Sequence, residues 1–266
     1  MIHPFDDSAD RAFPGVTRAE LSSALDALLQ PSMFKDYGPN GLQVEGRPAV
    51  RRLVTGVTAS LALIDAAIAE EADAILVHHG LFWRGQDGRV TGWMRQRLGR
   101  LIEQNLNLYA FHLPLDAHPL LGNNAQLAKR LGLTRMEGAA GSFGDQSLGW
   151  VGSGDFEHCE AFAVHVERLL GRSVTLIPGD GRAVRRVALC TGGAQGYFEA
   201  AIAAGADVYL TGEISEPQAH YARECGVAYV ACGHHASERY GVQAVGRHLA
   251  ETLGIEHVFI DIPNPA

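Results

Sequence analysis

A stretch near the start of the chain recurs 134 positions later, and this repeat constrains the fold more than any other feature. Residues 51–80 align with residues 185–214 without a gap. The matched positions are Arg51-Arg52 with Arg185-Arg186, Ala66–Ala69 with Ala200–Ala203, Ala72-Asp73 with Ala206-Asp207, and Leu76 with Leu210. Each copy has a β-like run, a helical run with one apolar face, and a second short apolar run. This order predicts an α/β protein of two related halves, with mostly parallel sheets.

The segments outside the repeat indicate where the halves begin and end. A capping-box pattern at Thr17 and Glu20 predicts the start of a helix. The glycine-rich turn Gly138–Gly144 favours a boundary between the two copies. We therefore expect a flexible leader at residues 1–16 and a first α/β half at residues 17–133. A connecting layer at residues 134–182 is expected to pack on the second α/β half, at residues 183–266.

Three apolar runs of the chain end abruptly in histidine. They end at His78-His79, at His112 and at His234-His235. An acidic residue follows two of these histidines at a spacing of four, because Asp116 comes after His112 and Glu238 after His234. A buried strand that ends in histidine places imidazoles at the rim of a sheet, where α/β proteins bind their ligands. The pattern predicts that the three segments meet at one site in the cleft between the halves.

The residues at these strand ends form a donor set typical of a metal site. Mixed imidazoles and carboxylates bind Zn, Mn, Fe, Co or Ni, and the candidates here are too many for one tetrahedral site. They are His78, His79, His112, Asp116, His234, His235 and Glu238. If a helix begins just after His234, Glu238 lies one turn on and faces the same cavity, whereas His235 points elsewhere, behind the ligands. The alternative is a polar interface of hydrogen-bonded histidines between the halves.

Two further segments are candidates for contacts with a ligand. The turn-rich segment Asp36–Gly46 is either a surface loop or a cavity wall, in which Asn40 and Gln43 hold a substrate or the second nitrogen of a ligating histidine. The segment Thr191–Gly196 lies between a predicted strand and helix, where its glycines serve either a phosphate or a tight turn.

Glu213 occupies the repeat position of His79, so it is expected at the matching rim of the second sheet. It is either a proton shuttle, together with His112, or a salt-bridge or helix-capping residue.

Composition excludes several classes of protein. The net charge of −8 argues against general nucleic-acid binding, which needs a basic surface. No apolar run approaches the 18 or so residues that cross a membrane. The four cysteines have no metal-binding spacing, and the acidic residues 1–15 do not form a signal peptide, so a reduced, cytoplasmic setting is expected.

Five separated motifs together resemble the Nif-three-like (YbgI-like) family, whose members are called GTP cyclohydrolase 1 type 2 homologues. The motifs are Asp36–Gly46, Val77–Gly80, His112–Asp116, Thr211–Glu213 and Gly233–Glu238, and the resemblance extends from about residue 17 to residue 262. It implies two similar α/β domains, a dinuclear metal centre in the cleft between them, and a ring-shaped homohexamer. The inserted central domain of longer members is not expected in a chain of this length.

The resemblance also implies a set of metal ligands. Carried over motif by motif, these are His78, His79, Asp116, His234 and Glu238. Glu238 would bridge two divalent metal ions, with His79 and Asp116 on one and His78 and His234 on the other. His112 would lie at the edge of the site.

A pair of metal ions makes metal-assisted hydrolysis the expected reaction class, on a small nucleotide-like or phosphorylated substrate. Nothing in the sequence identifies a guanine pocket. The alternative is a non-catalytic metal-binding scaffold or regulatory partner protein, which would use the same ligands.

Overall fold

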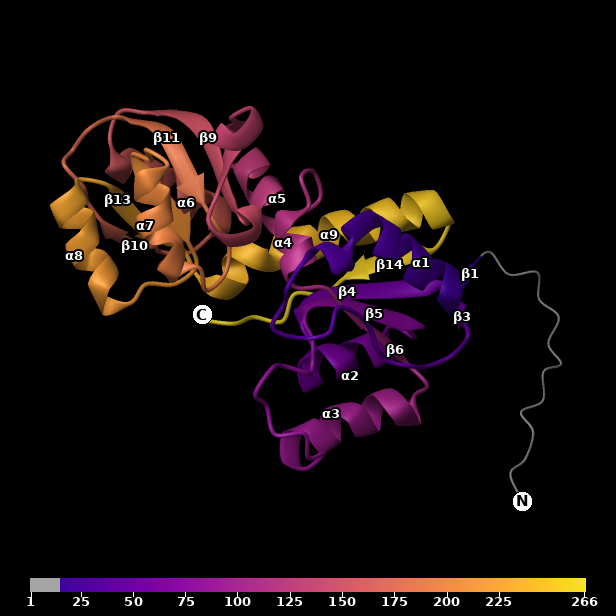
Figure 1. Ribbon diagram of the computed structural model, residues 1–266. Coiled ribbons are helices and arrows are strands. Elements are labelled where there is room, and N and C mark those ends of the chain that lie inside the picture. The colour runs from indigo at the N-terminus through magenta and orange to yellow at the C-terminus, as the bar shows by residue number, and fades with distance from the viewer. Residues whose placement is uncertain (1–14) are drawn as a thin grey trace, which may run out of the picture.

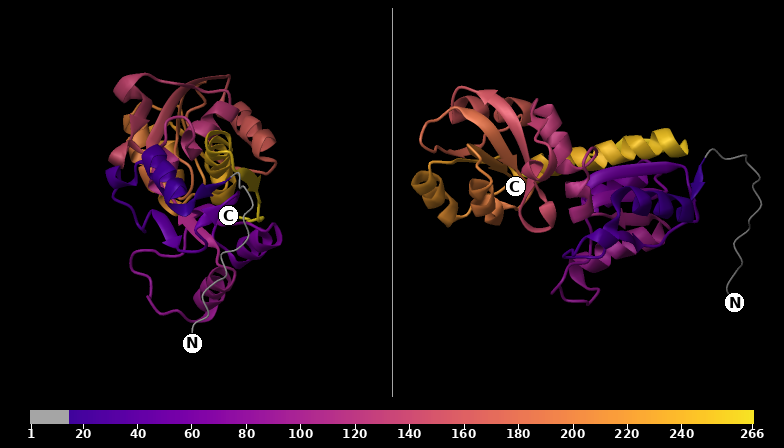
Figure 2. Two further views of the ribbon diagram at one scale, coloured as in Figure 1. Left: turned by 90° about the vertical axis from the view of Figure 1, so that its right-hand side faces the viewer. Right: turned by 45° about the horizontal axis from the view of Figure 1, so that its top comes forward.

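The computed structural model describes residues 15–266, which form two lobes joined by a long C-terminal helix (Figure 1). The helices are α1 (Arg18–Leu29), α2 (Leu61–Ala69), α3 (Gly92–Glu103), α4 (Leu113–Ala117), α5 (Asn123–Arg130), α6 (Cys159–Leu170), α7 (Phe198–Ala203), α8 (Glu216–Cys225) and α9 (His234–Leu253). Helix α9 begins in the second lobe and runs across the first (Figure 2). None of the helices within residues 15–266 has the length and apolarity needed to cross a membrane. The leader expected over residues 1–16 lies outside the described residues, except for Gly15 and Val16.

The first lobe is built on a five-stranded sheet in the order β14-β4-β5-β6-β2. Its strands are β2 (Gly41–Val44), β4 (Arg52–Thr58), β5 (Ala74–His79), β6 (Asn107–Ala110) and β14 (Glu256–Phe259). Strands β14, β4, β5 and β6 run parallel, and the edge strand β2 is antiparallel to β6. A separate antiparallel pair is formed by β1 (Val16–Thr17) and β3 (Ala49–Val50).

Helices cover both faces of the first sheet, because the side chains of each strand alternate between two apolar surfaces. In β5, Ile75 and Val77 pack with α2 and α3, whereas Ala74 and Leu76 pack with α1 and α9. All four side chains are fully buried. A strand that is buried on both faces needs a continuous apolar run, which explains the uninterrupted sequence before His78.

The second lobe contains a seven-stranded mixed sheet in the order β10-β13-β12-β11-β9-β7, with β8 paired to β9. Its strands are β7 (Thr134–Arg135), β8 (Ser142–Phe143), β9 (Gly149–Phe156), β10 (Thr175–Ile177), β11 (Val184–Leu189), β12 (Val208–Thr211) and β13 (Ala228–Ala231). Strands β11, β12 and β13 are parallel, and β9 and β10 flank them in antiparallel orientation. Helices α5 and α6 pack on one face, and α7 and α8 on the other. The expected α/β class is confirmed, with the second sheet parallel at its centre.

The sequence repeat is a structural repeat at the centre of each sheet. Strand β4, helix α2 and strand β5 in the first lobe match β11, α7 and β12 in the second. The strand registers are identical, because Leu53 pairs with Ala74 in one copy and Val187 pairs with Val208 in the other. The two lobes therefore share a parallel core, to which each adds different edge strands.

The repeated Ala-Asp and Arg-Arg pairs fix that register. Asp73 Oδ2 accepts hydrogen bonds from the backbone amides of Arg51 and Arg52, at 2.8 and 3.0 Å. Asp207 Oδ2 accepts the corresponding bonds from the amides of the second Arg-Arg pair, at 2.9 and 2.8 Å. In each lobe a carboxylate before the second strand thus binds the start of the first strand.

The C-terminal segment departs from the expected division into halves. Strand β14, which was expected in the second half at 183–266, pairs with β4 in the first sheet. Helix α5, expected within 17–133, contributes Leu127 and Ala128 to the core of the second lobe. Both departures cover a sheet surface that would otherwise be open. Strand β14 pairs with the edge of β4, and helix α5 packs on a face of the second sheet. Residues 134–182 supply strands β7 to β10 of the second sheet.

The Asp73 contacts predict an effect on stability. Asp73→Ala is expected to lower the free energy of unfolding by about 2–3 kcal/mol, because two strand amides and the Arg47 guanidinium lose a charged acceptor. Asp207→Ala is expected to have a smaller effect, because its side chain is 16% exposed and that of Asp73 is 4% exposed. Urea denaturation followed by circular dichroism measures both. The control is Asp65→Ala in the surface pair with Arg100, and an equal loss in this control would contradict the interpretation.

Candidate metal centre

The adjacent histidines of β5 lie at the end of a strand whose side chains alternate between two faces. His78 continues the row of Ala74 and Leu76 toward α9, and His79 continues the row of Ile75 and Val77. His78 is fully buried, whereas His79 is partly exposed. The two imidazoles therefore leave opposite faces of the strand but remain in contact, with ring centroids 4.5 Å from each other and a tilt of 45°.

Helix α9 begins at His234, which meets the condition set for Glu238, and brings Glu238 to the same place one turn later. Glu238 is 2% exposed, and three imidazoles point at its carboxylate. Its Oε1 lies 3.3 Å from His78 Nε2, and its Oε2 lies 3.4 Å from His79 Nε2 and 3.3 Å from His234 Nε2. One carboxylate thus joins histidines from both lobes.

Asp116 reaches the cluster from the short helix α4, which follows β6. Its Oδ1 lies 3.5 Å from His78 Nε2. The same oxygen accepts hydrogen bonds from Asn123 Nδ2 at 2.9 Å and from Thr191 Oγ1 at 3.2 Å. Asp116 is 7% exposed, and its carboxylate is oriented by buried partners from α5 and from the loop after β11.

The nitrogen of each imidazole that faces away from Glu238 is held by another group. His78 Nδ1 lies 3.1 Å from the carbonyl oxygen of Phe111, and His79 Nδ1 lies 3.1 Å from Thr58 Oγ1. His234 Nδ1 lies 2.6 Å from Glu213 Oε1. A proton on each Nδ1 leaves Nε2 with a free lone pair, and this is the arrangement that metal-ligating histidines have in proteins.

Two polar atoms at the centre of the cluster have no hydrogen-bond partner among the described residues. They are His78 Nε2 and Glu238 Oε2, both buried. Buried polar atoms are normally paired, so an unpaired imidazole nitrogen and an unpaired carboxylate oxygen in one cluster fit a cation bound there. The residues form groups that could hold a metal ion, namely His78 with Asp116 and Glu238, His79 with His234 and Glu238, and His78 with His79 and His112.

This grouping differs from the expected division of ligands. His78 lies with Asp116, and His79 lies with His234, whereas the expectation paired His79 with Asp116 and His78 with His234. The alternation of the strand is the reason. His78 is on the face that packs against α9 and lies beside α4, and His79 is on the opposite face.

Neighbouring carboxylates raise the pKa of two imidazoles of the cluster, whereas burial lowers the pKa of a third. Burial opposes charge on His78, but Asp116 and Glu238 outweigh it and raise the pKa of His78 to about 9. Burial also opposes charge on His234, but Glu238 and Glu213 raise its pKa to about 9. Burial and the neighbouring imidazoles lower the pKa of His79 to about 3. The carboxylates therefore favour positive charge at this position, and a metal cation would supply it.

His112 lies at the rim of the cluster and is held from behind. Its Nδ1 lies 2.7 Å from Asp36 Oδ1, and its backbone amide donates to Asn40 Oδ1 at 2.8 Å. Burial would raise the pKa of Asp36, but hydrogen bonds from His112 and Asn40 lower it to about 2. Gln43 braces the next loop, because its Oε1 accepts from the amide of Leu81 at 2.8 Å. Asn40 and Gln43 therefore shape the cavity wall through backbone contacts.

Glu213, His235 and the Thr191–Gly196 loop also have defined places. Glu213 binds His234 through Oε1 and accepts from Gln195 Nε2 at 3.2 Å through Oε2. His235 faces away from the cluster, with its Nε2 2.9 Å from Asp261 Oδ1. The loop amides of Thr191 and Gly192 donate to Asn124 and Ser237, so two of its donors serve the fold and are not available for a phosphate.

Sequence reasoning missed several residues that position the ligands. Asp36, Asn123 and Thr191 orient His112 or Asp116 by direct hydrogen bonds. A single polar residue in a loop does not show which distant side chain it will meet. The one available signal was the density of hydrogen-bonding side chains in Asp36–Gly46.

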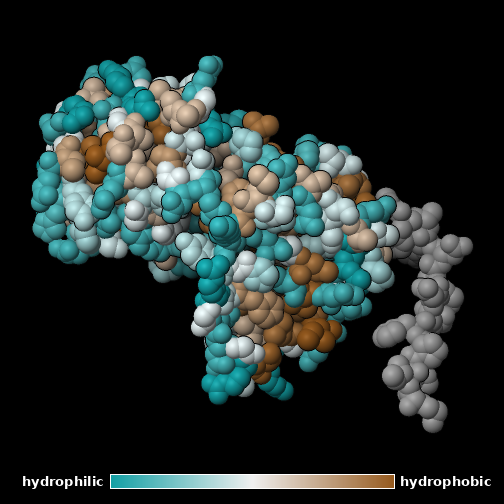
Figure 3. Space-filling model, viewed as in Figure 1, coloured by the Kyte–Doolittle hydropathy of each residue, from teal (hydrophilic) through white to brown (hydrophobic). Residues whose placement is uncertain are grey.

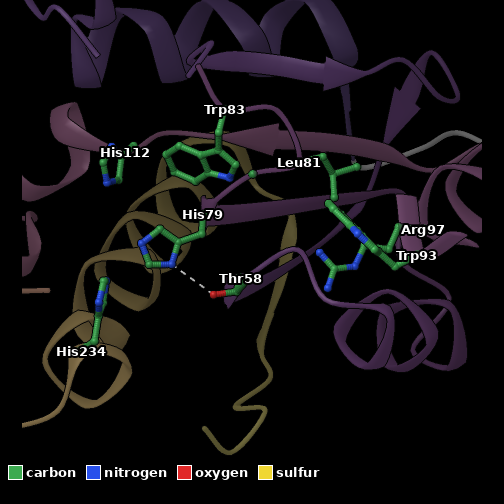
Figure 4. A pocket seen from close by; sticks show the side chains of 9 residues that line it. Thr58, His79, Leu81, Trp83, Trp93, Arg97, His112 and His234 are labelled. Atoms are coloured by element: carbon green, nitrogen blue, oxygen red, sulfur yellow. Dashed lines mark hydrogen bonds between the residues drawn. The ribbon is translucent and has the colours of Figure 1, made fainter. Parts of the chain in front are cut away.

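A pocket opens beside the cluster, with a volume of about 410 Å³ (Figure 4). His79, His112 and His234 lie on one side of it, and Trp93 and Arg97 lie on the other, with Trp83 and Thr58 between them. The volume is within the range of small-molecule sites. The cluster is therefore accessible to a small ligand from this side.

The fold and the site place this chain in a class of α/β proteins. In this class, two three-layer lobes meet at buried histidines and carboxylates that form a candidate metal centre. The model of the family described as Duf34/NIF3 (NGG1p interacting factor 3) matches residues 16–265, and the chain belongs to this family. The expected resemblance is thus confirmed.

Relatives of this chain are similar over nearly its whole length. A Pseudomonas aeruginosa protein is 51% identical over 252 residues, covering 94% of this chain and 99% of the relative. A Neisseria meningitidis protein is 48% identical over 254 residues, covering 94% and 100%. Both are named GTP cyclohydrolase 1 type 2 homolog.

Solved structures share the fold. The protein YbgI, described as a structural-genomics protein of unknown function, has a TM-score of 0.89 and 44% identity, covering 94% of this chain and 100% of YbgI. A Thermus thermophilus protein has a TM-score of 0.83 and 34% identity, with the same coverage.

Gly192 predicts a way to disturb the cluster without replacing a candidate ligand. Its φ is +73°, and a Cβ there would lie 2.0 Å from Glu238 Oε1. Gly192→Ala is therefore expected to displace this carboxylate and to weaken binding of Co²⁺ by about tenfold or more. Spectroscopic Co²⁺ titration measures the change.

Gly254→Ala is the matched control for Gly192→Ala. Gly254 has a φ of +69°, and nothing lies within 4 Å of its Cβ position. This variant carries a comparable backbone strain of about 1–2 kcal/mol and should bind Co²⁺ like the unaltered protein. Equal weakening in both variants would show that strain alone is responsible.

Proposed function

We propose that this protein is a dinuclear metal-dependent hydrolase acting on a small nucleotide-like or phosphorylated substrate. The observation that carries the proposal is the convergence of three imidazole Nε2 atoms, from two lobes, on the buried carboxylate of Glu238. The unpaired Nε2 of His78 and the unpaired Oε2 of Glu238 support the proposal, because they leave a buried donor atom without a partner in each of the two proposed ligand sets.

The proposed ligands divide into two sets that share Glu238. His78 and Asp116 would hold one ion, and His79 and His234 the other. This donor set accepts Zn, Mn, Fe, Co or Ni. Such ions, when bound, polarise the substrate, stabilise developing negative charge and activate water at neutral pH.

The surrounding residues have roles that follow from their contacts. Phe111, Thr58 and Glu213 fix the orientation of the three imidazoles, so the ligand geometry exists before any substrate arrives. Glu213 is a positioning residue, because both of its oxygens are engaged.

His112 is the proposed proton shuttle. It lines the pocket, and its Nδ1 is held by the ionised Asp36. This contact leaves Nε2 for proton transfer with a substrate in the pocket. The names of the relatives agree with hydrolysis of a nucleotide ring.

Self-association is a further part of the proposal, following the ring-shaped hexamer that the family resemblance implies. Exposed apolar side chains support it, including Leu42 on the edge strand β2 and Ile102 on α3, which are 37% and 67% exposed. Figure 3 shows hydrophobic residues gathered on one side of the first lobe. Light scattering on the purified full chain measures the number of copies.

The ligand division predicts different metal contents for different variants. Glu238→Gln is expected to lose both ions, because the shared carboxylate is removed. Asp116→Asn and His234→Gln are each expected to keep about one ion of two, from opposite sets. Metal analysis after gel filtration measures the content. Loss of both ions in every variant, or retention of both in Glu238→Gln, would contradict the division.

The proton-shuttle role predicts a catalytic defect without metal loss. His112→Asn is expected to keep the full metal content and to lower kcat by about 10²- to 10⁴-fold. The assay measures turnover of a panel of nucleotides, phosphoesters and cyclic amides by metal-loaded protein. His220→Asn, in a surface pair with Glu216, is the control and should match the unaltered protein. If the unaltered protein binds two ions and turns over nothing in the panel, a non-catalytic metal scaffold is favoured instead.

A further inference from the structure

The pocket beside the cluster extends well beyond the candidate metal ligands. Its far wall is formed by Trp93 and Arg97 of α3, and by Leu81 (Figure 4). None of these residues belongs to the proposed metal or proton-transfer groups. The far wall can therefore bind a part of the substrate that does not react.

Arg97 is a cation without an anionic partner in the described part of the chain. Its guanidinium lies over the Trp93 ring, 4.8 Å from the centroid, and no ion pair or hydrogen bond to a carboxylate accompanies this contact within residues 15–266. The neighbouring Arg100, by contrast, pairs with Asp65 at 3.3 Å. A guanidinium that lies over an indole and has no carboxylate partner is suited to a phosphate or carboxylate oxygen.

Trp83 forms an aromatic wall between the two ends of the pocket. Its ring lies 5.1 Å from His112 and 5.9 Å from His79, measured between centroids. Figure 4 shows it near both histidines, with Leu81 between it and Arg97. A planar ring placed against Trp83 would lie next to the cluster, because indoles bind flat heterocycles by stacking.

We propose that the pocket selects a flat heterocyclic ring that carries an anionic group, with the ring against Trp83 and the anion on Arg97. This inference rests on the proposed function and names its substrate class. Trp93 holds the guanidinium in place, and the reacting bond of the ring then lies toward His79 and His112. The separation of the two ends lets one residue recognise charge and another recognise the ring.

A small molecule fits this pocket better than a nucleic-acid strand. The chain has a net charge of −8, and a strand would need several cations along its path. Among the described residues that line the pocket, away from the candidate metal centre, Arg97 is the one arginine or lysine, in a volume of about 410 Å³. A small molecule with one anionic group on one ring matches this single guanidinium.

Calorimetry on the metal-loaded full chain separates the two contacts. The probes are adenosine 5′-monophosphate, which has ring and phosphate, adenosine, which has the ring, ribose 5-phosphate, which has the phosphate, and orotate, a flat ring with a carboxylate. Arg97→Gln is expected to raise the Kd about tenfold or more for the anionic probes and to leave adenosine unchanged. Trp83→Leu is expected to raise the Kd for the ring-containing probes and to leave ribose 5-phosphate unchanged. Stronger binding of adenosine 5′-monophosphate or of orotate identifies the anion as phosphate or carboxylate.

Arg95→Gln is the matched control, since Arg95 lies on the same helix, is exposed and does not line the pocket. It should bind all probes like the unaltered protein. Equal losses in Arg95→Gln and Arg97→Gln, or no loss in Arg97→Gln, would overturn the proposal, as would stronger binding of an oligonucleotide than of the monophosphate. Metal content is measured for each variant and should stay unchanged. Arg97-dependent binding without any turnover would contradict the proposed hydrolase alone, and turnover without Arg97 dependence would contradict the pocket assignment alone.

Discussion

The buried carboxylate of Glu238 is the constraint on which the arrangement of the two lobes depends. A carboxylate that is 2% exposed is costly unless positive or hydrogen-bonding groups surround it. Here the surrounding groups are imidazoles from β5 of the first lobe and from the first turn of α9. Later turns of α9 insert Val242, Val245 and Leu249 into the core of the first lobe. One helix therefore carries the central carboxylate and also fixes the lobe that supplies its partners.

The three imidazoles of the cluster are held by different kinds of hydrogen-bond partner. His78 and His79 are held from behind by neutral oxygens, a backbone carbonyl and the Thr58 hydroxyl. His234 is held by the Glu213 carboxylate, which increases the basicity of its imidazole. Glu213 occupies the repeat position of His79, so the two related lobes place a candidate ligand on one rim and the support for a candidate ligand on the other.

The contacts around the cluster join the lobes by more than the candidate ligands. Thr191 of the second lobe donates to Asp116, and the amide of Gly241 on α9 donates to Asn123 at 2.9 Å. Buried polar contacts of this kind permit few alternative arrangements, because a displaced lobe would leave each of them unpaired. The pocket lies on the open side of the same interface, so its shape is set by the position of the lobes.

The sequence alone determined the α/β class and the repeated core, because these depend on local periodicity and on a repeat that is readable along the chain. It also identified His78, His79, Asp116, His234 and Glu238, which the structure brings together. The tertiary structure alone decided which histidine faces which acid, the return of β14 to the first sheet, and the meeting of Asp36 with His112. These features depend on the face of a strand, on an open sheet edge and on contacts between residues far apart in sequence. Such contacts are chosen by packing in three dimensions, and no local pattern encodes them.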